Sequence, residues 1–251
     1  MTREIVAFAA AFFAGAVNSV AGGGTLITFP ALIWLGLPSV TANATSTVSI
    51  WPGSLGAMWG YRGELRAVET RLFALALPSV VGGLAGAALL RLTPAPVFDR
   101  LVPILILFAT LLFMSQEPIQ RWLGSATHAH HRRWWLIGAM MFQLLVGVYG
   151  GYFGAGIGIL MLAALGIFGL TDIHQMNGLK NIFALCINGT AALYFISMGM
   201  VSWTEVLVMA TGAIAGGVWG AGVARRAGPR TVRWLVVGIG FAMALSLALR
   251  R

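Results

Sequence analysis

One lysine stands alone in an apolar segment, and its charge needs an explanation. Lys180 is the only lysine of the chain and lies eight residues into the hydrophobic run 172–199. A charged side chain inside a membrane helix costs at least about 2.5–3.5 kcal/mol, so such residues are usually functional or paired. Neither Asp172 nor Glu205 stands three or four residues away. Lys180 is therefore a candidate partner for a substrate anion, with snorkelling to the membrane surface as the alternative.

Two glycine clusters form a second candidate feature, at Gly22-Gly23-Gly24 and at Gly154-x-Gly156-x-Gly158. Glycine lets backbone approach a ligand closely, and a helix that begins after it directs N–H groups and a positive dipole end at an anion. Neither cluster is a dinucleotide fingerprint or a P-loop, because no βαβ unit and no Gly-Lys-Ser/Thr accompanies it. Packing by small residues is the alternative. We prefer that alternative for Gly82, Gly83, Gly86, Gly216, Gly217 and Gly220.

Polar side chains follow each cluster along the chain. Asn177, Lys180 and Asn181 share one helical face through their i, i+3, i+4 spacing. Amides and hydroxyls can donate hydrogen bonds to an oxyanion, whereas bonds between helices, worth about 0.6 kcal/mol on average, are an equal alternative. The corresponding polar run before residue 50 consists of Thr41, Asn43, Thr45, Ser46, Thr47 and Ser49.

Residues for enzymatic or metal chemistry are missing from the sequence. It has no Gly-x-Ser-x-Gly elbow, no His-Glu-x-x-His motif and no pair of intramembrane aspartates, and Cys186 has no histidine nearby. His128, His130 and His131 lack a neighbouring carboxylate or cysteine, so we interpret them as a solvated loop. We expect no metal and no cofactor. Asp172 and His174 are candidates for coupling to an ion or proton, although we prefer a helix N-cap and its neighbour.

The composition predicts an all-α integral membrane protein. The chain is 59% hydrophobic and 9% charged, whereas soluble domains carry about 25% charged residues. Apolar runs such as 73–90 and 203–223 are long enough to cross a bilayer as helices. The net charge of +9 comes from arginines between these runs, which is typical of membrane loops, so we expect no nucleic-acid partner.

An internal repeat organises these segments. At an offset of about 134 residues, Gly22 and Gly24 match Gly156 and Gly158, and Asn43 matches Asn177. We predict a first membrane repeat at 1–115, a polar connector at 116–132 and a second repeat at 133–251. Each repeat has five hydrophobic segments, and the second of each five is short and glycine-opened, as in broken or re-entrant helices. If the short segments turn back, about eight membrane crossings remain. If they cross the membrane fully, each half has five spans and the repeats are inverted, so the sequence leaves open whether the repeats are parallel or inverted. The predicted segments are 4–20, 23–37, 39–60, 68–91 and 97–114, then 133–150, 153–169, 172–199, 203–224 and 231–249.

Short motifs recur in order along both halves. The first half contains Gly15-x-x-Asn18-x-x-Ala21-Gly22-Gly23-Gly24-Thr25, then Pro30, Gly36, Pro38 and Ala42-Asn43-Ala44-Thr45-Ser46. The second contains Gly151-x-x-Gly154-x-Gly156-x-Gly158 and Asn177-x-x-Lys180-Asn181. Together they resemble the TauE/SafE sulfite exporter family over essentially the whole chain. The resemblance implies a bacterial or archaeal cytoplasmic-membrane permease with duplicated halves, whose relatives move sulfite, sulfoacetate and other sulfur-containing or organic anions.

These observations predict a secondary transporter that moves a small anion by alternating access between the two halves, and the resemblance implies sulfite, an organosulfonate or another sulfur-containing organic anion as its substrate. A passive anion channel and a non-transporting assembly subunit are the alternatives, and a membrane enzyme is the least favoured. The expected partners are the small anionic substrate, the lipid bilayer and a coupling ion or proton. The sequence leaves open the anion, the direction and the oligomeric state. The candidate substrate-binding residues are Asn18, Gly22, Gly23, Gly24, Asn43, Thr45, Ser46, Gly154, Gly156, Gly158, Asn177, Lys180 and Asn181.

Overall fold

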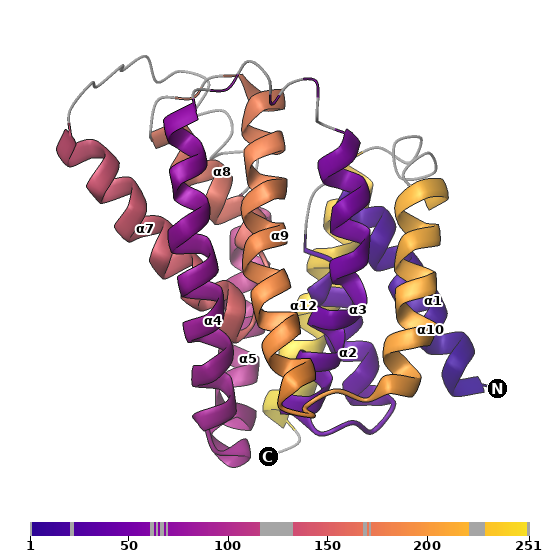
Figure 1. Ribbon diagram of the computed structural model, residues 1–251. Helices are drawn as coiled ribbons and strands as arrows, with labels where there is room; N and C mark the ends of the chain where they lie inside the picture. Colours follow the sequence, from indigo (N-terminus) through magenta and orange to yellow (C-terminus); the bar gives the residue numbers. More distant parts are fainter. Residues whose placement is uncertain are drawn as a thin grey trace.

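The described part of the protein is helical, as the composition predicts. The computed structural model describes residues 2–20, 23–60, 63, 65, 68, 70–115, 133–167, 170, 172–220 and 229–249. All regular secondary structure in these residues is helix (Figure 1). The predicted connector 116–132, with its three histidines, lies outside them.

Each side of the connector contributes one series of helices in the same order of lengths. The first series is α1 (Thr2–Val20), α2 (Thr25–Trp34), α3 (Ser39–Gly60), α4 (Ala76–Leu92), which the 3-10 turn η2 (Thr70–Leu75) precedes, and α5 (Ala95–Met114). The second is α7 (Arg133–Tyr152), α8 (Ile157–Ile167), α9 (Ile173–Ser197), α10 (Trp203–Ala215), which the π-helical turn η3 (Gly216–Gly220) continues, and α12 (Pro229–Leu249).

The second helix of each series is short, as predicted. With 10 residues in α2 and 11 in α8, these helices are about 15 and 17 Å long at 1.5 Å per residue. A bilayer core is about 30 Å thick, so neither helix alone reaches across it. The end of α2 is set by Gly36, whose φ of +86° suits glycine. There the N–H of Leu37 donates to Leu32 O, and the N–H of Gly36 donates to Ile33 O.

Helices of one series pack on helices of the other, and we call the pairs α1–α10 and α7–α4 the exchanged pairs. Helix α1 lies against α10 and η3, and α7, its counterpart in the second series, lies against α4. Helices α3 and α9 pack together at the centre, and α5 packs on α12. In Figure 1, α1 rises from the end of the bundle that holds the N-terminus, whereas α7 descends toward that end. Counterpart helices thus run in opposite directions.

Glycines allow the exchanged pairs to approach closely. A Cβ atom at Gly82 would lie 2.6 Å from Leu144 O, and one at Gly86 would overlap Val148 O on α7. On the other side, a Cβ at Gly216 would overlap Phe12 O on α1. The packing interpretation is thereby confirmed for these glycines and for Gly83, which abuts α9. It is wrong for Gly217, where a Cβ would meet nothing within 4 Å.

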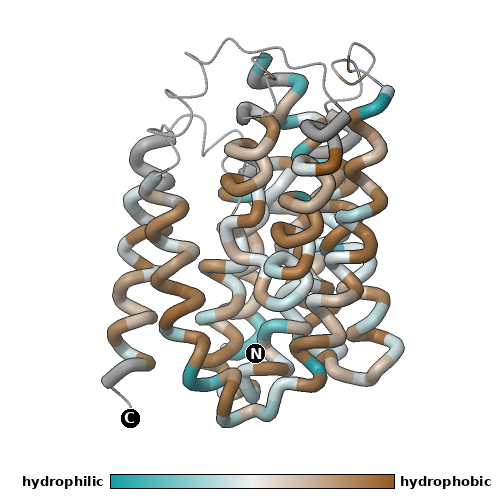
Figure 2. The backbone as a smooth tube through the Cα atoms, turned by 90° about the vertical axis from the view of Figure 1, so that its left-hand side faces the viewer, coloured by the Kyte–Doolittle hydropathy of each residue, from teal (hydrophilic) through white to brown (hydrophobic). Residues whose placement is uncertain are grey.

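The outer surface is apolar along the length of the helices. Ile104, Leu145 and Leu207 are each more than 60% exposed, and hydrophilic residues gather at the two ends of the bundle (Figure 2). Among the described residues, three helical stretches are long and apolar enough to cross a membrane, with five shorter apolar helices beside them. The three stretches are Thr70–Leu92, Ala95–Leu112 and Gln175–Ser197.

Candidate functional site

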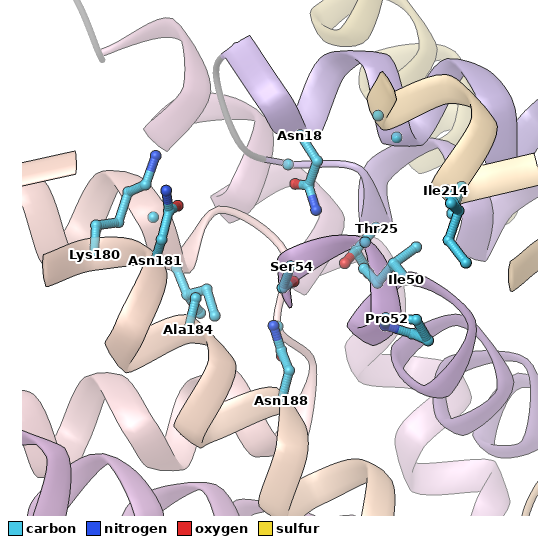
Figure 3. Close-up of a pocket in the computed structure, with 18 of the residues that line it drawn as sticks. Asn18, Thr25, Ile50, Pro52, Ser54, Lys180, Asn181, Ala184, Asn188 and Ile214 are labelled. Carbon is cyan, nitrogen blue, oxygen red and sulfur yellow. The ribbon is translucent and has the colours of Figure 1, made fainter. Parts of the chain in front are cut away.

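A cavity of about 450 Å³ lies among the helices where α2 and α8 begin. Its walls come from both series: the end of α1, the start of α2 and the second half of α3, then the start of α8, the middle of α9, and α10 with η3. Figure 3 shows polar side chains from α1, α3 and α9 directed into this space. The cavity brings together six of the sequence-predicted residues, namely Asn18, Gly23, Gly154, Gly158, Lys180 and Asn181.

Positive φ angles at three glycines turn the chain into the two short helices. Gly23 has φ +97°, Gly154 +80° and Gly156 +79°, values that side chains with a Cβ rarely adopt. Behind the second turn, the hydroxyl of Tyr149 donates to Ala155 O at 2.7 Å. At the start of α2 the N–H groups of Leu26, Ile27 and Thr28 donate to Gly23 O and Gly24 O, so the two helix starts in the cavity wall contribute mainly the positive ends of their dipoles.

Asn18 presents a donor to the cavity. Its Oδ1 accepts a hydrogen bond of 3.2 Å from the backbone N–H of Gly24. An N–H can only donate, so the amide must turn its oxygen toward Gly24 and its Nδ2 away from it. In Figure 3 the nitrogen of Asn18 points into the cavity. The loop before α2 therefore fixes the orientation of this amide.

Lys180 is the charged group among the described residues that line the cavity. Its side chain is only 8% exposed, and its Nζ donates to Asn177 Oδ1 at 3.0 Å. Gly158 leaves room for the aliphatic part, since a Cβ there would lie 3.3 Å from Lys180 Cδ. The described residues that line the cavity include no carboxylate. The positive charge thus meets no negative side chain among the described residues of the cavity wall.

Two pairs of positions at the offset of 134 residues meet in this cavity. Ile50 and Ser54 line it from α3, and Ala184 and Asn188 line it from α9. Ser54, Thr25 and Asn188 were not predicted as site residues. The repeat offset was the signal that could have found Ser54, because it corresponds to Asn188.

Six other predicted residues lie outside the cavity wall, among them Asn177, which contacts Lys180. Asn43 Nδ2 donates to Tyr152 O at 2.9 Å, and Thr45 Oγ1 accepts from the N–H of Ser202 at 3.0 Å. The hydroxyls of Ser46 and Thr28 lie 2.6 Å apart. These bonds join helices to each other. Gly24 packs against Ala14 and Gly156 against Ala109, while Gly22 lies outside the described residues.

Asp172 caps the helix that carries Lys180. Its Oδ1 accepts the backbone N–H of Gln175 at 3.3 Å, and its carbonyl oxygen accepts that of Met176 at 3.0 Å. This is the N-cap arrangement, in which a side chain satisfies a free donor of the first turn. The preferred interpretation of Asp172 is confirmed, whereas the side chain of His174 lies outside the described residues.

The sequence as a whole is similar to known membrane proteins. Residues 7–247 match the family described as sulfite exporter TauE/SafE. A probable membrane transporter protein, ORF9, of Sinorhizobium sp is 29% identical over 249 residues, which cover 96% of this chain and 90% of the relative. A probable membrane transporter protein of Haemophilus influenzae is 28% identical over 244 residues, or 96% and 93% of the two chains. The probable membrane transporter protein YfcA of Escherichia coli is 27% identical over 243 residues, or 96% and 88%. No solved structure matches the chain.

Proposed function

Because this chain belongs to the TauE/SafE sulfite exporter family, we propose that it is a secondary transporter that carries a small anion by alternating access. The family consists of membrane transporters and not of enzymes, so the chain is a multi-pass membrane transport protein. We assign it to the cytoplasmic membrane of a bacterium or archaeon. Sulfite or an organosulfonate is the substrate class that the proposal favours, with a coupling ion or proton as a further partner.

The observation that carries the proposal is a buried cation in a cavity walled by donors. Lys180 and Asn18 offer N–H groups to the cavity, and the starts of α2 and α8 in its wall add the positive ends of two helix dipoles. Preorganised donors and a positive charge in a site of low dielectric constant favour an anion over a neutral or cationic solute. A cationic substrate would meet the Lys180 charge with no carboxylate among the described lining residues to offset it.

The exchanged packing supports alternating access. We propose that the two series of helices are inverted repeats, in each of which the second of five traversing segments is the short helix, and that the cavity lies where the repeats meet. Counterpart helices run in opposite directions, and the pair α1 and α10 corresponds to the pair α7 and α4. Inverted repeats with half-helix N-termini at the binding site are an established basis for alternating access in transporters. Rocking of one repeat against the other would expose the same cavity to either side in turn.

Ligand-dependent stability tests the anion site first. The purified protein is unfolded thermally with sulfite, sulfoacetate, taurine, thiosulfate, sulfate or a carboxylate at equal ionic strength. A ligand at a hundredfold excess over its Kd stabilises the fold by about 2.7 kcal/mol. We expect one sulfur oxyanion to stabilise the wild type and not Lys180→Ala. The control Arg91→Ala removes a charge from the exposed end of α4 and should respond as the wild type does. Equal stabilisation of wild type and Lys180→Ala would contradict the site.

Flux separates a carrier from a channel. In proteoliposomes loaded with unlabelled anion, a carrier accelerates uptake of labelled anion by exchange, and its rate saturates. We expect both properties, and their loss in Lys180→Ala. A conductance that rises linearly with anion concentration would instead identify a passive channel, and absence of flux despite binding would identify a non-transporting subunit.

A further inference from the structure

The wall of the cavity opposite Lys180 is largely apolar, and Thr25 of α2 is the polar residue that lies beside it. In Figure 3, Ile50, Pro52 and Ile214 lie on the side of the cavity away from Lys180 and Asn181. Ile50 and Pro52 belong to α3, and Ile214 belongs to α10. The cavity therefore has a charged side built on α9 and a hydrocarbon side built on α3 and α10.

The cavity is several times larger than a compact oxyanion. An anion of four or five non-hydrogen atoms fills about as much space as two or three water molecules, roughly 60–90 Å³. The cavity measures about 450 Å³, within the range of about 300–1,000 Å³ that is typical of sites for organic ligands. An oxyanion bound at Lys180 would leave the space along Ile50, Pro52 and Ile214 to water. Water against an apolar wall is less favourable than an apolar group in the same place.

We propose that Ile50, Pro52 and Ile214 form an apolar subsite that takes the hydrocarbon substituent of an organic monoanion whose charged group lies at Lys180. The proposal rests on the anion-transport function proposed above and narrows its substrate class. Lys180 is the only cationic side chain among the described lining residues, which favours one negative charge over two. The substrate is then a short organic sulfonate or similar monoanion, rather than a bare inorganic oxyanion.

A homologous series of alkyl sulfonates tests the subsite. Affinities for methane-, ethane-, propane- and butanesulfonate are measured with the whole protein at equal ionic strength, from ligand-dependent thermal unfolding. We expect affinity to rise about fourfold for each added methylene, the ratio that corresponds to about 0.8 kcal/mol per buried methylene. Affinity that is constant or falls along the series would overturn the subsite.

Two variants tie the chain-length dependence to these residues. Ile50→Ala and Ile214→Ala should each lower the ratio of the butanesulfonate affinity to the methanesulfonate affinity by at least about fourfold, since each removes apolar contact comparable to a methylene or more. Because the two residues lie on different helices, one variant remains informative if the other does not fold. Leu207→Ala is the matched control, since Leu207 lies on α10 and is 65% exposed on the outer surface. A ratio unchanged in both isoleucine variants would refute the assignment.

Binding of methanesulfonate distinguishes a failure of the subsite proposal from a failure of the proposed function on which it rests. One outcome is that methanesulfonate stabilises the wild type and not Lys180→Ala, while the affinity is the same for all four alkyl sulfonates. In that case only the subsite proposal fails. If methanesulfonate binds the wild type and Lys180→Ala equally, the anion site at Lys180 fails, and the proposed function fails with it. Binding that depends on Lys180 and increases with chain length through Ile50 and Ile214 supports both.

Discussion

The ammonium group of Lys180 donates a 3.0 Å hydrogen bond to Oδ1 of Asn177, one turn earlier on α9. An amide oxygen orients the ammonium without neutralising it, because the amide carries no charge. The position next to Lys180 thus holds a group of the size of a carboxylate that lacks its charge. This arrangement keeps the cation available to an anion in the cavity.

Asn177→Asp should therefore convert an open anion site into an internal ion pair. The substitution keeps the shape of the side chain and places a carboxylate where Oδ1 meets Lys180. We expect affinity for the best sulfur oxyanion to fall at least about tenfold, or about 1.4 kcal/mol, as measured by ligand-dependent thermal unfolding. Gln175→Glu adds the same charge on α9 outside the cavity wall and should lower affinity far less. Similar losses of anion affinity in both variants would mean that any added negative charge on α9 lowers the affinity, and that the contact with Lys180 is not the cause.

Asn18→Asp should remove a donor from the cavity without removing the acceptor for Gly24. The carboxylate can still accept the N–H of Gly24, so the unliganded protein should unfold within about 4 °C of the wild type, as for a change near 1 kcal/mol. Anion affinity should fall at least about tenfold, because Nδ2 is lost and a negative charge faces the substrate. Asn18→Ala is the companion variant, and it should lose less affinity. Unchanged binding in Asn18→Asp would show that the amide does not face the anion.

Gly158→Ala should displace Lys180. The added methyl group would lie 3.3 Å from Lys180 Cδ, closer than ordinary contact, so the lysine must shift by a few tenths of an ångström. We expect anion affinity to fall roughly threefold, or about 0.6 kcal/mol, in the same binding assay. Gly138→Ala on α7 is the control, since a Cβ there would meet nothing within 4 Å. If the two alanine variants bind equally well, the space at Gly158 is not needed to position the lysine.

Gly86→Ala should destabilise the contact between α4 and α7. A Cβ at this position would overlap the carbonyl oxygen of Val148 and approach Tyr152 N to 2.7 Å, and backbone atoms cannot yield as a flexible side chain does. Overpacking costs about 1–3 kcal/mol, so the unfolding temperature in detergent should fall by several degrees. Gly138→Ala should leave it unchanged or raise it, because alanine favours helix over glycine by about 1 kcal/mol. Equal unfolding temperatures would show that the helices can separate at no cost.

Much of the architecture was predictable because the bilayer restricts the choices. Without water to satisfy backbone groups, an apolar chain must form helices, and the lengths of the apolar runs then predicted two short segments in matching places. The helix directions could not be predicted. They depend on whether 23–37 and 153–169 turn back, which is decided by packing between α1 and α2 and between α7 and α8.

The site was predicted better on α9 than on α3. Lys180 was evident because charge is costly in an apolar helix, whatever that helix packs against. The segment 41–49 is polar on more than one face, so its sequence does not specify which face meets the cavity. In the structure Asn43, Thr45 and Ser46 bond to neighbouring helices, and Ser54, about two turns farther along than Ser46, lines the cavity. The rotation of α3 about its axis results from long-range packing.

Lys180, the one cationic side chain among the described residues that line the cavity, makes the proposed cycle sensitive to membrane potential. While Lys180 carries its proton, the empty site is positive and the site filled by a monoanion is neutral. Moving one charge across the membrane is worth about 2.3 kcal/mol per 100 mV, so voltage acts on the return of the empty carrier and not on the loaded step. In liposomes with an imposed potassium diffusion potential, net transport should respond to voltage, whereas exchange of one anion for another should not.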